Sequence, residues 1–73
     1  MPLAFITSDS LWFAIDVYEK RPVGFVKIFT KGPFKATPDA AKEELEETVK
    51  NNLSREVVMH RFDQGEQRWV KWP

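Results

Sequence analysis

The 73-residue chain contains no cysteine, one histidine and three glycines, and its eleven basic side chains balance eleven acidic ones. Without cysteine it has no disulfide, zinc–thiolate site or thiol nucleophile, which favours the reducing cytoplasm. Its apolar runs fall far short of the roughly 20 residues of a membrane span, and its start lacks the basic leader of a secretory signal. We therefore expect a cytoplasmic protein with no membrane partner.

Catalytic patterns are also scarce. His60 is the only histidine, and a single histidine in a strand is typical of a structural or exposed residue. The glycines at 24, 32 and 65 are too far apart to form a phosphate-binding loop, and no serine lies in a nucleophile-elbow pattern. The sequence thus predicts no enzyme, cofactor, metal site or small-molecule substrate.

Aromatic residues, by contrast, are abundant: six Phe, three Trp and one Tyr. A domain near this size buries only about 60% of the surface that its unfolded chain exposes. Each large ring removes roughly 150–250 Å² from water, so most of these rings are expected to build the core of a single domain, residues 1–73. The remaining rings are candidates for contact with a partner.

The first half predicts a hairpin. Apolar residues alternate from Leu11 to Glu19, as in a strand with one face on a core, and the pattern resumes from Phe25 to Thr30 after a turn at 19–24. Residues 31–36 are expected to form a loop, and Leu3 to Thr7 could add a short strand.

A helix is expected to begin at Thr37-Pro38-Asp39, because Thr can cap, Pro suits the first helical position and Asp favours the positive end of the helix dipole. It is expected to end at residues 51–54. The spacing predicts one apolar stripe and an opposite charged face. The predicted stripe consists of Ala41, Leu45, Thr48, Val49 and Asn52 or Leu53.

The last third predicts a second hairpin, with strands at 56–62 and 66–72 and a three-residue loop in which Gly65 takes the left-handed position. Because short turns join antiparallel strands, the fold class is α+β. We predict an antiparallel sheet of three to five strands, formed by two hairpins, with one helix packed on one face. The alternation places Trp69 and Trp72 on opposite faces, so only one of them can point toward the helix.

The sheet face without the helix is the main candidate binding surface, although the sequence leaves open which residues lie on it. Trp, Tyr and Arg dominate binding hot spots, whereas in the alternative interpretation the rings simply cover the back of the sheet. Rings and cations could also stack single-stranded RNA or DNA, although the neutral charge and the missing RNA-recognition pattern disfavour this. The candidate partner-binding residues are Trp12, Tyr18, Arg61, Arg68, Trp69, Lys71 and Trp72.

The helix supplies a second candidate surface. Residues 37–54 hold five acids and two bases, whereas both flanking segments are mildly basic. A solvated helix face explains this composition without any partner. The functional alternative is an acidic docking face for a basic protein surface, formed by Glu43, Glu46 and Glu47.

In its length, lack of cysteine, scarcity of histidine, wealth of aromatic residues and Thr37-Pro38-Asp39 helix between hairpins, the chain resembles the small phage-encoded inhibitors of bacterial RNA polymerase. This resemblance implies a host bacterial cytoplasm and binding to the host polymerase near the RNA exit channel, where nearby RNA could be contacted. It also implies displacement of the sigma factor and antitermination. It assigns no contact residue.

Overall fold

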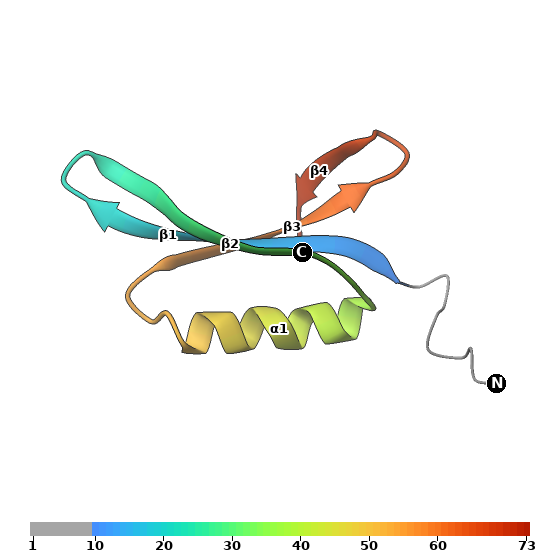
Figure 1. Ribbon diagram of the computed structural model, residues 1–73, viewed down its shortest axis with the longest axis horizontal. Helices are drawn as coiled ribbons and strands as arrows, with labels where there is room; N and C mark the ends of the chain where they lie inside the picture. Colours follow the sequence, from blue (N-terminus) through green and yellow to red (C-terminus); the bar gives the residue numbers. More distant parts are fainter. Residues whose placement is uncertain (1–9) are drawn as a thin grey trace.

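A computed structural model describes residues 10–73 and has the predicted α+β class. The elements are β1 (Leu11–Arg21), β2 (Gly24–Ala36), α1 (Pro38–Lys50), β3 (Glu56–Asp63) and β4 (Arg68–Lys71). One antiparallel sheet has the strand order β2-β1-β3-β4, and α1 lies across one of its faces (Figure 1). The strand predicted at 3–7 falls outside the described residues.

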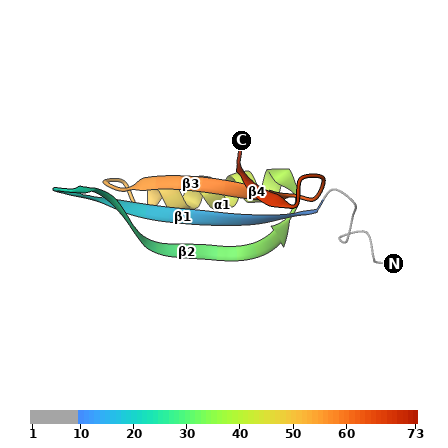
Figure 2. The ribbon, with the colours of Figure 1, turned by 90° about the horizontal axis from the view of Figure 1, so that it is seen from above.

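The core lies between the sheet and α1. Phe13, Ile15 and Val17 of β1 are fully buried, as is Ala41 of α1, and Met59 of β3 is 1% exposed. The odd positions of β1 thus face the helix, as the alternation predicted. Seen from above, the strands run side by side over the helix (Figure 2).

The helix begins as predicted, since the Ala40 N–H donates to Thr37 Oγ1 at 3.2 Å and Pro38 occupies the first turn. The predicted apolar stripe is only partly correct. Ala41 and Thr48 are buried, but Val49 is 43% exposed and Leu53 is 83% exposed. The helix meets the sheet along one narrow line of side chains, and Val49 lies about 100° around the axis from Thr48.

The predicted loop at 31–36 was wrong, because β2 continues to Ala36. The strand accommodates two irregularities: Gly32 and Pro33 together lie opposite Ala14, and Ile28 is an extra residue between the pairs Val17–Phe29 and Tyr18–Lys27. Extra residues of this kind form bulges, which let pairing continue past a glycine and a proline. Gly32 and Pro33, residue types that usually interrupt a strand, therefore mark a bulge here rather than the end of the strand.

The second loop also differs from its prediction. Asp63 pairs with Arg68, so the loop has four residues, 64–67. Gln67, with φ 56°, takes the left-handed conformation that was predicted for Gly65. The Gly65 N–H instead donates to Asp63 Oδ1 at 2.9 Å, a local side-chain bond that shapes the turn.

The bulge at Gly32 yields a first prediction. Gly24 and Gly32 have φ values of +124° and +110°, so alanine at either position is expected to cost about 1–3 kcal/mol in backbone strain. A Cβ on Gly32 would also lie 3.0 Å from Phe34 N and 3.1 Å from Phe13 O, whereas Gly24 has no neighbour within 4 Å. Gly32→Ala should therefore unfold at a clearly lower urea concentration than the matched variant Gly24→Ala. Equal midpoints would contradict this assignment.

Candidate docking face

The sheet side opposite α1, here called the open face, is covered by no element of residues 10–73. Both hairpin ends bend away from the helix, so this side curves upward at its two ends (Figure 1). Cross-strand pairs share a face, so the register assigns its residues. They are Trp12, Ala14, Asp16, Tyr18 and Lys20 of β1; Phe25, Lys27, Thr30 and Lys35 of β2; Glu56, Val58, His60 and Phe62 of β3; and Trp69 and Lys71 of β4.

Large rings are exposed on the open face. Trp12 is 42% exposed, Trp69 39% and Phe25 57%. Trp69 packs edge-on against Phe62, with ring centroids 5.4 Å apart and planes at 70°, the offset geometry that aromatic pairs prefer. This pair holds Trp69 in place while leaving part of its ring available.

A polar cluster surrounds Asp16 at the centre of the open face. Thr30 Oγ1 donates to Asp16 Oδ1 at 2.6 Å. Lys27 Nζ lies 3.8 Å from the same oxygen, and His60 Nδ1 lies 3.5 Å from Asp16 Oδ2. The Asp16 side chain is only 14% exposed, so the Thr30 hydroxyl and the Lys27 ammonium offset the cost of a largely buried carboxylate.

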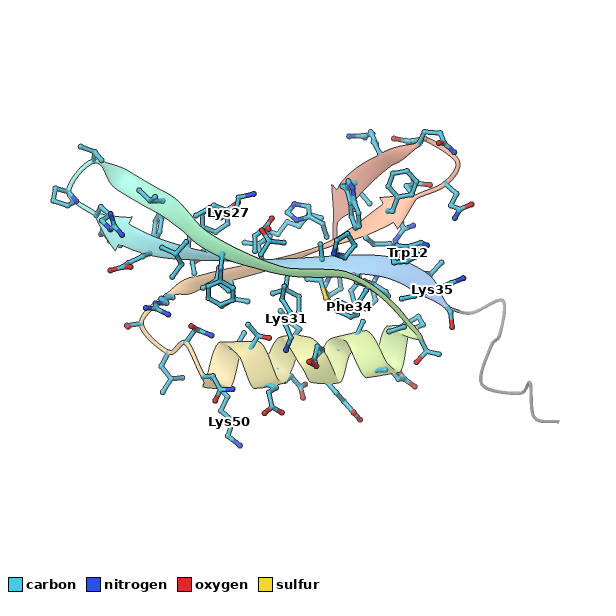
Figure 3. The ribbon with its side chains drawn as sticks, viewed as in Figure 1. Trp12, Lys27, Lys31, Phe34, Lys35 and Lys50 are labelled. Atoms are coloured by element: carbon cyan, nitrogen blue, oxygen red, sulfur yellow. The ribbon has the colours of Figure 1, made fainter. Side chains whose placement is uncertain are left out.

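The charges of the two sides differ. The open face carries four lysines, Lys20, Lys27, Lys35 and Lys71, and two acids, Asp16 and Glu56. In α1, five acids accompany two lysines. Lys27 rises on the open side, whereas Lys31 and Phe34 point toward the helix (Figure 3). Lys31 Nζ contacts Glu44 Oε2 at 2.6 Å there. The open face is therefore mildly basic, whereas α1 is acidic.

The structure divides the predicted partner-binding residues between the two faces. Trp12, Tyr18, Trp69 and Lys71 share the open face. Trp72 lies on the helix side, where its ring centroid is 5.0 Å from that of Phe13. The two tryptophans thus face opposite ways, as the alternation predicted.

Arg61 and Arg68, two candidates for the uncovered sheet face, lie on the helix side instead. Arg61 pairs with Phe13 and therefore lies on the helix side. Arg68 pairs with Asp63, which lies two residues after Arg61 in β3, so Arg68 lies on the helix side as well. Arg68 Nε also donates to Glu66 Oε1 at 2.6 Å. The predicted acidic residues Glu43, Glu46 and Glu47 are all exposed on α1.

Sequence reasoning missed several open-face residues, chiefly Phe25, Lys27, Thr30 and Lys35. Strict alternation groups Phe25, Lys27 and Phe29, but the extra residue Ile28 moves Phe29 to the helix side and Thr30 to the open face. Lys35 was missed because its segment was assigned to a loop. No local signal marks a bulge at Ile28.

No protein-family model, curated protein or solved structure matches this chain. Among residues 10–73, no group of three or more His, Cys, Asp or Glu side chains is placed to hold a metal ion. Within the same residues no helix has the length and apolar character needed to cross a membrane.

Proposed function

We propose that this protein is a protein-binding regulator of bacterial transcription, which docks on the host RNA polymerase through its open face and catalyses no reaction. The observation that carries the proposal is the exposure of Trp12, Phe25 and Trp69 on a sheet face that no described element covers. Large rings with polar surroundings are typical anchors of protein interfaces. The resemblance described above supplies the polymerase as partner, with sigma displacement and antitermination as consequences.

The charge pattern supports a protein partner over single-stranded nucleic acid. Asp16 lies in the middle of the open face and Glu56 pairs with Tyr18 on it. A phosphate backbone carries a charge at every nucleotide and would meet both acids, whereas a polypeptide can place carboxylates beside the lysines and neutral groups beside Asp16 and Glu56. Four lysines with exposed rings nevertheless make an oligonucleotide the competitor that any binding test must include.

Binding to polymerase is expected to depend on the exposed rings. Trp12→Ala and Trp69→Ala should each weaken the complex with purified polymerase by about 2 kcal/mol, or about 30-fold, because hot-spot truncations reach this size. The matched control is Leu53→Ala, which removes an 83% exposed apolar side chain outside the sheet. The measurement is a titration of polymerase holoenzyme with labelled protein, followed by detection of released sigma factor.

Two outcomes would refute this proposal. The first is recovery of no polymerase on the tagged protein from nuclease-treated bacterial lysate. The second is binding that falls steeply with salt and persists with oligonucleotide alone, which is the behaviour of a nucleic-acid binder. If Trp12→Ala and Trp69→Ala bind polymerase as tightly as Leu53→Ala, then the docking surface lies elsewhere, and the acidic face of α1 is the next candidate.

A further inference from the structure

The centre of the open face is hollowed. The hollow, of about 430 Å³, falls within the range of roughly 300–1,000 Å³ that is usual for ligand pockets. Its apolar lining comes from Ala14, Pro33 and Trp69, and its polar lining includes Asp16, Lys27 and His60. Four strands contribute to it, so it exists only in the folded sheet.

The hollow has two structural causes. Ala14 has the smallest side chain among the open-face residues of β1, and its β3 partner is His60. On the β2 side, Gly32 and Pro33 both lie between the pairs Phe13–Phe34 and Ile15–Lys31, so no regularly paired side chain faces Ala14. The bulge thus leaves open space above Ala14, with Pro33 and Trp69 in its lining.

One part of the hollow is cationic. Lys27 Nζ forms an ion pair with Asp16 Oδ1 at 3.8 Å, beyond ordinary hydrogen-bond length, so its N–H donors can still bind another acceptor. Lys71 pairs with His60 and shares this face. It has no acidic partner among the salt bridges of residues 10–73. Asp16 already accepts from Thr30, which leaves the lysines as the ionic groups available to a partner.

We infer that this hollow is the anchor site for an acidic polypeptide segment. One large apolar or aromatic side chain of the partner fills the space over Ala14, beside Pro33 and Trp69, and a neighbouring carboxylate binds Lys27 or Lys71. Charge complementarity selects this occupant, since lysines outnumber acids on the open face by four to two. The inference deepens the proposed function and rests on it only for the partner's identity.

The test fills the hollow without disturbing the core. Ala14→Leu adds apolar bulk on the open face, and its matched control is Ala40→Leu on an exposed position of α1. Lys27→Glu reverses the charge beside the hollow, and Lys42→Glu does the same on α1. Thermal unfolding and circular dichroism establish that each variant is folded. If Ala14→Leu fails to fold, Ala14→Val serves as the smaller filling variant.

The probes are purified RNA polymerase, a fluorescent twelve-residue peptide with Phe at its centre and Asp or Glu at alternate positions, its Lys-substituted counterpart, and oligo(U). Fluorescence anisotropy in about 0.15 M salt gives the affinities. We expect the acidic peptide to bind best. Its affinity should fall at least about tenfold for Ala14→Leu and Lys27→Glu and should not change for the two controls. The Lys peptide should bind Lys27→Glu better than it binds the natural protein.

The outcomes separate this inference from the proposed function. If polymerase binds Ala14→Leu and Lys27→Glu as tightly as the natural protein, the proposed function is unaffected and the anchor site is refuted. If Ala14→Leu loses binding of the acidic peptide and neither the natural protein nor any variant binds polymerase, the anchor site is supported and polymerase is refuted as the partner. Tighter binding of oligo(U) than of the acidic peptide, or binding of neither peptide, overturns the inference. The inference is also overturned if the protein self-associates and Ala14→Leu abolishes this self-association, since a second copy would then be the occupant.

Discussion

Replacing Phe13 with Ala is expected to lower the free energy of unfolding by about 3–5 kcal/mol, the range for a fully buried Phe. Phe13 is 0% exposed and packs between two other rings, with centroid distances of 6.1 Å to Phe34 and 5.0 Å to Trp72. Its loss leaves a cavity at the centre of the only core that residues 10–73 form. Native domains are stable by about 5–15 kcal/mol, and small ones lie at the low end, so the variant should be largely unfolded at 37 °C.

Urea unfolding followed by circular dichroism measures this loss. The matched control is Phe25→Ala, which removes the same side chain at a position that is 57% exposed on the open face. That change should cost less than about 1 kcal/mol, because little apolar surface returns to water. Similar losses for the two variants would contradict the placement of Phe13 in the core.

The two C-terminal tryptophans should behave in opposite ways when each is replaced with Ala. Trp72 packs on Phe13. Its backbone N–H donates to the Met59 carbonyl at 2.9 Å, and alanine would keep this bond, so the substitution removes only the ring. Because Trp72 is only half-buried, Trp72→Ala should cost about 2–3 kcal/mol of unfolding free energy, below the range for fully buried Trp. Trp69→Ala loses mainly its edge contact with Phe62 and should cost about 1 kcal/mol.

Binding should reverse this order. At a temperature where both variants are folded, Trp69→Ala should weaken polymerase binding and Trp72→Ala should leave it nearly unchanged, because only Trp69 lies on the open face. Unfolding curves and polymerase titrations of the same preparations make the comparison. A Trp72 variant that is stable but unable to bind would show that the docking surface includes the helix side.

Local chemistry explains which elements were predictable. The N-terminal cap at Thr37, the first-turn Pro38 and the alternation of β1 all depend on neighbours within a few residues, so the sequence carries their signal directly. The loop of the second hairpin was predicted less well, because Gln67 rather than Gly65 adopts the left-handed conformation. Four-residue and three-residue loops with one glycine look alike in sequence, and strand pairing decides between them.

The candidate site was predicted only in part, because the rest of it depends on pairing between strands that are distant in the chain. Period-two alternation predicted that Trp12 and Tyr18 share one face of β1, and that Trp69 and Lys71 share one face of β4, because successive side chains of a strand point to opposite faces. It did not predict which face of the sheet each of these sets joins, since that depends on pairing between strands, such as Arg61 with Phe13 and Arg68 with Asp63. Lys27 and Thr30 join Asp16 only because Ile28 is an extra residue in β2. A one-residue shift moves every later side chain to the other face.

The sequence alone, through composition and short-range periodicity, determined the abundance of rings and lysines, the absence of cysteine and the order of hairpin, helix and hairpin. Tertiary structure alone decided that Trp72 joins Phe13 in the core while Trp69 stays on the open face with Lys27 and His60. The strand order β2-β1-β3-β4 and the two bulges of β2 bring these residues together. Pairing between strands distant in the chain is set by packing of the whole sheet on α1, which no local pattern encodes.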